Sequence, residues 1–259
     1  MPGLVTFQQL SHLGRLANQI FQITATWSHA KRYGHDYLIP TWPYSKYFQT
    51  EFNQADSLPA PTYKYSELRY FHDLIPNTGG CLDICGYFHS LKYWTSIEDI
   101  QKLFKPKEEV LADIIKLYPI LATHTCVSIH VRRTDYKVNE FLGVLSVEYY
   151  KEALKHITDK NVVYLIFGDD LDWARKNLSF LDPVHFIQSE INIYDMFAMS
   201  LCKYNITANS TFSWWSSMLN MNIDKQVIML KNWMLPHCKF DQRELVVPGW
   251  TALDPIFGD

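Results

Sequence analysis

The chain of 259 residues lacks the features that mark membrane, secreted and nucleic-acid-binding proteins. Its longest apolar run, residues 162–167, is far too short to cross a bilayer. Residues 1–10 lack the basic segment and long apolar stretch of a secretory signal. With 24 Lys and Arg against 27 Asp and Glu, there is no basic excess for broad contact with nucleic acid or anionic lipid. We therefore expect a soluble, cytoplasmic protein with no nucleic-acid partner and no stable membrane insertion.

Familiar metal and nucleotide motifs are also missing. The five cysteines form no Cys-x-x-Cys pair, and the ten histidines show no His-x-His or His-Glu-x-x-His spacing. The sequence has neither a Gly-x-Ser-x-Gly elbow nor a Gly-Lys-Ser/Thr phosphate loop. These gaps argue against a zinc site, a serine hydrolase and a P-loop protein. They predict free thiols in a reducing compartment.

The second half of the chain alternates apolar runs with helical patterns. Strands are predicted at 126–132, 162–167, 184–187, 204–208 and 226–230. Helices are predicted at 147–157 with Ser146 as the cap, at about 171–177, at 192–202, and from near Ser210. Such alternation with short connections indicates a parallel sheet covered by helices on both faces.

The first half is less regular. A strand at 4–7, a helix from residue 16 that ends at Gly34, and a strand at 37–39 would form a βαβ unit. Residues 41–80 look irregular, which suits acceptor-binding loops or a mere connection. A further strand at 82–88 and helices at 96–104 and 107–117 complete this half. We place the domain boundary near residue 120, which divides the chain into lobes 1–120 and 121–259.

Two adjacent arginines stand where the first strand of the second lobe ends. Arg132 and Arg133 would point to opposite sides, so one can face a ligand while the other supports it. A guanidinium stays charged, and its planar fork matches two phosphate oxygens. Because ligands bind beyond the carboxyl ends of parallel strands, His130 and Asp169 should lie at the same edge. The alternative is an Arg133–Asp135 ion pair that only stabilises the chain.

A polar turn follows another strand at this edge. Its residues are Asn209, Ser210, Thr211, Phe212 and Ser213. Hydroxyl groups and unpaired N–H groups at a helix start are ready phosphate ligands. Ordinary N-capping by Asn209 or Ser210 would use the same groups. Because Arg132 is expected opposite this turn, we favour an anion site.

The segment Asp170-Leu171-Asp172 has a DxD pattern, which can hold a divalent cation. Here it lies between a predicted strand and a predicted helix. Asp170 is therefore expected to cap the helix, and Asp172 to favour its N-terminal dipole. Since Arg132 and the turn at Ser210 would already neutralise an anion, we expect no metal and no other cofactor.

Four stretches together resemble the α-1,2-fucosyltransferase family, which includes bacterial and animal H-antigen-type enzymes. They are Gly-Arg-Leu-Ala-Asn-Gln-Ile-Phe-Gln at 14–22, His-Val-Arg-Arg-Thr-Asp-Tyr at 130–136, Phe-Gly-Asp-Asp at 167–170 with Trp173, and the segment from Tyr194-Asp195 to Trp214-Trp215. The resemblance covers residues 14 to 220, in the family's order. The His-x-Arg core is also shared with α-1,6- and protein O-fucosyltransferases.

The resemblance implies an α/β, GT-B-like fold of two Rossmann-type lobes with the donor site in the cleft. It implies metal-independent, inverting transfer of L-fucose from GDP-fucose to a glycan hydroxyl, as in a galactoside α-1,2-fucosyltransferase. By similarity, Arg132 would bind the β-phosphate, and His130, Asp169 and residues 209–213 would help hold the donor. Gly14 and Asn18 would approach the donor from the N-terminal lobe.

Two departures from the family pattern soften these expectations. Ala17 replaces a usual glycine, and Thr134 replaces the glycine common in the α-1,2 group. Another linkage, a protein acceptor, or an inactive glycan- or nucleotide-sugar-binding module therefore remain alternatives. Glu140 lies ten residues after His130, the offset of the proposed base in α-1,6 enzymes, or it is only a solvated loop carboxylate. Asp135 is the second candidate base. The acceptor and the oligomeric state stay open.

Overall fold

The computed structural model describes residues 2–67, 74–238 and 243–258. Contacts divide the chain into two compact units, Met1–Lys107 and Glu108–Asp259. The division precedes helix α3 (Glu108–Leu117), which packs against α7 (Asn192–Ser200) in the second unit. The sequence predicts a boundary near residue 120, and the contacts group α3 with the second unit. No helix in the described part of the chain is long and apolar enough to cross a membrane.

The first unit is built on a parallel sheet with strand order β3-β2-β1-β5-β4 among its described residues. The strands are β1 (Leu4–Thr6), β2 (Asp36–Pro40), β3 (Gln54–Ala55), β4 (Tyr63–Ser66) and β5 (Cys81–Cys85). Helix α1 (Leu16–Tyr33) packs against β1 and β2, and Gly34 ends it in the left-handed conformation (φ 67°), as expected. Helix α2 (Ile97–Leu103) follows Ser96, which caps it by accepting from Asp99 N.

The segment 41–80 is more ordered than expected. It contributes the edge strands β3 and β4 to the sheet, so the prediction of a wholly irregular region is wrong there. Residues 68–73 of this segment lie outside the described residues. The described β5 is also three residues shorter at its end than predicted.

The second unit shows the alternation of strands and helices that the sequence predicts. Its strand order is β11-β10-β9-β6-β7-β8 over the described residues, and each pairing given is parallel. The strands are β6 (Thr125–Val131), β7 (Val162–Gly168), β8 (Val184–Phe186), β9 (Tyr204–Ile206), β10 (Gln226–Leu230) and β11 (Thr251–Leu253). The prediction of a parallel sheet is confirmed, and β11 is an additional edge strand.

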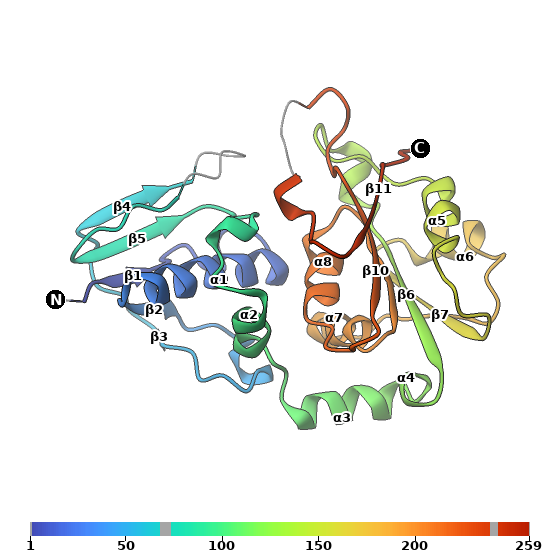
Figure 1. Ribbon diagram of the computed structural model, residues 1–259, viewed down its shortest axis with the longest axis horizontal. Coiled ribbons are helices and arrows are strands. Elements are labelled where there is room, and N and C mark those ends of the chain that lie inside the picture. The colour runs from blue at the N-terminus through green and yellow to red at the C-terminus, as the bar shows by residue number, and fades with distance from the viewer. Residues whose placement is uncertain (1, 68–73, 239–242, 259) are drawn as a thin grey trace. The chain divides into compact units, whose positions relative to one another are not determined.

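Helices cover both faces of this sheet. Figure 1 shows α7 and α8 (Thr211–Met218) on one side, with α5 (Val147–Leu154) and α6 (Leu171–Asn177) on the other. A short helix, α4 (Ile120–Thr123), leads into β6. The central strands are mostly apolar, and β6 is buried over its last six residues. Burial on both faces explains why these strands read as continuous hydrophobic runs.

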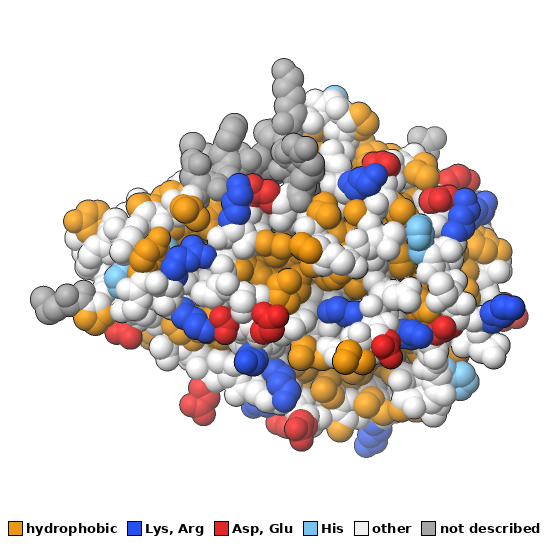
Figure 2. All heavy atoms as spheres, viewed as in Figure 1, with side chains coloured by type: hydrophobic (Ala, Val, Ile, Leu, Met, Phe, Trp, Pro, Cys, Tyr) orange, Lys and Arg blue, Asp and Glu red, His pale blue; other side chains and the backbone are white. Residues whose placement is uncertain are grey.

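On the face shown in Figure 2, acidic and basic side chains are interspersed.

All five cysteines are free thiols, as predicted.

Candidate active site

The carboxyl ends of β6, β7 and β9 lie side by side in the second unit. Register places Val131 of β6 opposite Gly168 of β7, and Ile129 opposite Ile206 of β9. Gly168 has a positive φ of 153°, and a Cβ there would lie 2.1 Å from the carbonyl oxygen of Val131. Only glycine allows this close approach, which brings Asp169 next to Arg132. The structure thus assembles the predicted edge.

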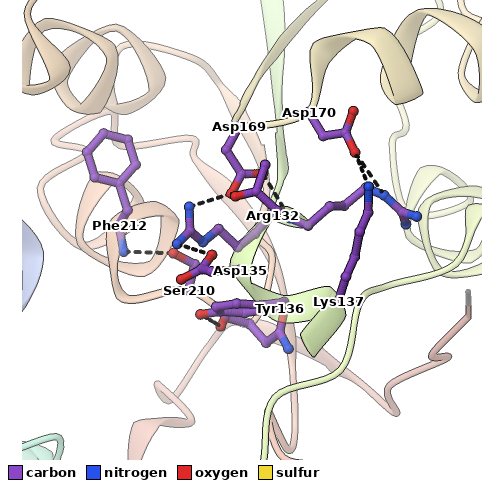
Figure 3. A network of polar contacts seen from close by, with 11 residues as sticks. Arg132, Asp135, Tyr136, Lys137, Asp169, Asp170, Ser210 and Phe212 are labelled. Carbon is purple, nitrogen blue, oxygen red and sulfur yellow. Dashed lines mark hydrogen bonds and ion pairs between the residues drawn. The ribbon is translucent and has the colours of Figure 1, made fainter. Parts of the chain in front are cut away.

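Arg132 is the charged centre of this edge (Figure 3). Its Nη1 donates to Asp169 Oδ2, and its Nη2 lies 2.5 Å from Asp135 Oδ1. The guanidinium carbon lies 5.1 Å from the centre of the Tyr136 ring. The Arg132 side chain is 16% exposed, so its charge is held in place but not sealed from a ligand. Fixed guanidinium groups of this kind suit diphosphate recognition.

Asp169 holds the Arg132 segment from the neighbouring strand. Beyond Arg132, its carboxylate accepts from the backbone N–H of Arg133 at 2.8 Å and from the Thr134 hydroxyl at 2.7 Å. Asp169 was predicted as a donor-binding residue. Since its carboxylate is bonded to three consecutive residues, it would act on a bound donor through Arg132.

Arg133 is buried, and its side chain contacts other residues than those that hold Arg132. Its guanidinium lies 4.1 Å from the Trp173 ring, and its Nη1 donates to the carbonyl of Leu145 at 3.3 Å. The expected Arg133–Asp135 ion pair is wrong, because Asp135 pairs with Arg132 across a single turn of 3-10 helix η3 (Asp135–Val138). Arg133 instead approaches Asp170, with Nε 3.6 Å from Oδ2.

Asp170 caps helix α6, as predicted from the DxD segment. Its Oδ1 accepts from Trp173 N at 3.1 Å, and its Oδ2 accepts from Lys137 Nζ at 2.9 Å. The Lys137 hydrogen bond is the main cause that lowers the pKa of Asp170. In the described ranges 2–67, 74–238 and 243–258, no group of three or more His, Cys, Asp or Glu is arranged to hold a metal ion.

His130 is buried beside Arg132 at the end of β6. Burial lowers the pKa of its imidazole to about 4, and the opposing influence of Asp169 offsets this only in part. The ring is therefore neutral near pH 7. It packs against Phe212, with ring centres 5.7 Å apart, and its Nδ1 has no hydrogen-bond partner within the described residues. Its Nδ1 is thus a polar atom without a protein partner inside the predicted donor site.

The turn at Ser210 begins helix α8, and the N-capping considered in the sequence analysis is present there. Ser210 caps the helix, because its Oγ accepts from Phe212 N at 3.3 Å. Ser213 Oγ donates to the carbonyl of Ser210 at 3.3 Å and accepts from Ala208 N at 3.2 Å. Thr211 and Phe212 are half-buried. A capping serine accepts through oxygen and keeps its own O–H proton, which remains available to an anion.

Asn209, which follows β9, forms hydrogen bonds with the loops that follow β6 and β10. Its Nδ2 donates to the carbonyls of Gly143 at 2.9 Å and Trp233 at 3.1 Å, while its own carbonyl accepts from Tyr136 Oη at 3.0 Å. Because β9 lies between β6 and β10, the segment 135–143 crosses over the turn at Ser210 to reach the β10 loop. Asn209, predicted to bind the donor, uses its amide nitrogen to hold this crossing.

Glu140 lies on that crossing segment. Its carbonyl accepts from His237 Nε2 at 2.9 Å, and the next carbonyl, of Phe141, accepts from Leu235 N at 2.8 Å. The residue itself is exposed. These hydrogen bonds hold the backbone at Glu140, and its carboxylate is open to solvent.

Gly14 and Asn18, the site residues predicted in the first unit, form a cluster of their own. Gly14 has φ 83°, and a Cβ there would lie 2.4 Å from Asn18 Nδ2. Asn18 Oδ1 lies 3.2 Å from His89 Nε2. Gln22 Nε2 joins the Gly14 turn to the loop after β5, because it donates to the carbonyls of Leu13 at 2.7 Å and Gly86 at 3.3 Å. Ala17, the departure from the family pattern, is buried within the helix.

The sequence analysis included Tyr136 and Asp195 only as parts of longer motifs, and it did not select His89. His89 lies in the loop that follows β5. Asp195 accepts from Ser189 N at 3.2 Å, and burial raises the pKa of its carboxyl group to about 6. A raised carboxyl pKa depends on the three-dimensional surroundings and has no sequence signal.

Comparison with known proteins agrees with this architecture. A solved structure titled as the NodZ alpha-1,6-fucosyltransferase soaked with GDP-fucose superposes with a TM-score of 0.55 at 15% identity, covering 85% of this chain and 93% of that one. The fold is therefore the α/β, GT-B-like fold of fucosyltransferases, with a parallel sheet in each unit.

The chain belongs to glycosyl transferase family 11, the α-1,2-fucosyltransferase family, whose model matches residues 35–254. It is 33% identical over 208 residues to the O-antigen biosynthesis glycosyltransferase WbnK of Escherichia coli, covering 74% of this chain and 67% of that one. It is 28% identical over 178 residues to an alpha-1,2-colitosyltransferase of the same species, covering 64% and 61%. The chain therefore spans about two thirds of the length of these relatives.

Proposed function

We propose that this protein moves L-fucose from GDP-fucose to a glycan hydroxyl with inversion, most simply to O2 of galactose or a similar sugar. The observation that carries the proposal is the fixed Arg132 guanidinium at the same edge as the N-terminus of α8. Together they offer a fork of donors, a helix dipole and hydroxyls to one diphosphate. Membership of family 11 supports the reaction class.

The chemistry explains why a guanidinium belongs at this place. Breaking the bond between fucose and the β-phosphate leaves negative charge on that phosphate and oxocarbenium character on the sugar. Charge that grows in the transition state is best stabilised by donors fixed beforehand. In this protein Asp169 and Tyr136 fix Arg132, and the neutral His130 adds no competing charge.

The direct test is transfer itself. Incubating the protein with GDP-fucose and a panel of galactose-terminated glycans should release GDP and yield a fucosylated product. Since Arg132 and the α8 turn supply the positive charge, the rate should not change when EDTA is added and should not rise with Mg²⁺ or Mn²⁺. Loss of turnover in EDTA, restored by a metal, would overturn the metal-free mechanism. A protein that binds GDP-fucose but transfers to no acceptor, protein acceptors included, would instead be a binding module.

The donor sugar has a second candidate. A relative with 28% identity is an alpha-1,2-colitosyltransferase, and colitose is fucose without its 3-hydroxyl. Running GDP-colitose beside GDP-fucose on the same acceptors settles the choice. The higher kcat/KM identifies the donor, and linkage analysis of the product separates O2 from other positions.

We also propose a cytoplasmic site of action, supported by the five free thiols.

Glu140 is proposed as the base that accepts the proton of the acceptor hydroxyl. Glu140→Gln should lower kcat by about 10²-fold or more with little change in the KM for GDP-fucose, because only proton transfer is lost. Glu148→Gln is the matched control, since Glu148 is an exposed carboxylate on α5 in the same unit. Steady-state rates across pH measure both. A wild-type rate for Glu140→Gln would exclude Glu140 and leave Asp135 as the candidate.

A further inference from the structure

Tyr136 connects the two anion-binding parts of the second unit. It follows the Arg132 segment, yet its hydroxyl donates to the carbonyl of Asn209, the residue before the helix cap Ser210. Its ring lies under the guanidinium of Arg132 at 5.1 Å, within the range of a cation–π contact. One side chain therefore touches both the arginine and the turn that should face it (Figure 3).

The remaining contacts of Arg132 do not set this relation. Asp169 fixes Arg132 relative to β7, and Asp135 belongs to the same turn as Tyr136. Asn209 binds Gly143 and Trp233 through its amide, and those contacts hold the far end of the crossing segment. Among the described contacts, Tyr136 is therefore the side chain that joins the Arg132 guanidinium directly to the backbone next to Ser210.

The geometry points to Tyr136 as a positioning residue that sets the spacing between the Arg132 guanidinium and the Ser210 turn, so that one diphosphate can bind both. This inference rests on the proposed function, and it adds a residue that acts through Arg132 rather than on the substrate. The Tyr136 hydroxyl sets the distance between the Arg132 segment and the Ser210 turn, and the Tyr136 ring limits the rotation of the guanidinium. Because burial raises its pKa to about 12, the phenol keeps its proton and donates throughout the working pH range.

Two variants separate the two parts of this role. Tyr136→Phe keeps the ring and removes the hydrogen bond to Asn209, while Tyr136→Leu removes both. We expect Tyr136→Phe to lower kcat about fivefold and to weaken GDP binding by less than about threefold, because a small misplacement costs most in the transition state. Tyr136→Leu should lower kcat by about 30-fold or more.

Tyr204→Phe is the matched control. Tyr204 is buried in the same unit, and its hydroxyl bonds Thr158 at 3.0 Å at the start of β9, away from the carboxyl edge. It should show a similar decrease in Tm to Tyr136→Phe with unchanged kcat and unchanged GDP affinity. If Tyr136→Phe and Tyr204→Phe have the same kinetics, Tyr136 is only structural.

A double-mutant cycle on GDP affinity tests whether Tyr136 acts through Arg132. Calorimetry would compare Tyr136→Leu in the wild-type protein and in Arg132→Lys. The effect of Tyr136→Leu should fall to less than about 1.5-fold in the second background, since there is no guanidinium left to position. Equal effects in both backgrounds overturn the inference. If the wild-type protein binds GDP but does not transfer fucose, the proposed function fails while the cycle still decides the role of Tyr136. Absence of GDP binding refutes both.

Discussion

Arg132→Ala should lower kcat/KM for GDP-fucose by at least about 10²-fold, equivalent to roughly 3 kcal/mol of transition-state stabilisation. The structure gives the reason: Arg132 is held by Asp169, Asp135 and Tyr136, so its donors are in place before the bond breaks. Alanine removes the charge and the fork together. Initial rates over a range of donor concentrations measure the loss, and circular dichroism confirms that the variant folds.

Arg132→Lys refines this prediction, because it keeps the charge and removes the fork. A lysine cannot keep the bond to Asp169 and also bind two phosphate oxygens, so we expect most of the loss seen with alanine. Arg175→Lys is the control: Arg175 also lies over an aromatic ring, 4.2 Å from Phe186, but on α6. Near-normal turnover of Arg132→Lys would show that two-point binding of the phosphate by Arg132 is wrong.

Asp169→Asn should lower kcat/KM about 10²-fold and should also lower the free energy of unfolding by about 2 kcal/mol. The carboxylate accepts from Arg132, from the backbone of Arg133 and from Thr134, and an amide cannot accept all of these bonds. Arg132 would lose its fixed orientation, while its charge remains. Rates and urea unfolding at pH 7 measure the two effects.

Asp172→Asn is the control for Asp169→Asn. Asp172 is exposed in the first turn of α6 and is the second acid of the DxD segment. We expect wild-type rates and a stability change within about 0.5 kcal/mol. A large loss of activity in Asp172→Asn would point to a metal held by the DxD segment and would contradict the metal-free mechanism.

The sequence predicts the central part of the second unit well, for a physical reason. Strands β6 and β7 are buried on both faces, so they appear as mostly apolar runs that end where the polar site begins. Edge strands carry no such pattern. Strand β4 is mostly exposed, and β11 is three residues long, so neither had a hydrophobic period to reveal it.

Within the site, strand ends could be predicted but ion-pair partners could not. The position of Arg132, His130 and Asp169 follows from where their strands stop. The partner of Asp135 depends on a single 3-10 turn that returns it to Arg132, and sequence spacing does not distinguish this from pairing with Arg133. The Asn209 amide reaches carbonyls 66 and 24 residues away, which local patterns cannot predict.

Because Arg132 is already paired with Asp135, an anion that binds Arg132 must replace the Asp135 carboxylate. One carboxylate already balances the guanidinium, and that carboxylate is 54% exposed and can turn toward water. A singly charged anion such as chloride gains little by replacing it, because one unit of charge would only substitute for another. A diphosphate brings more charge and a second contact at the α8 turn. The site can therefore discriminate among anions by valence, and donor binding would free the Asp135 carboxylate.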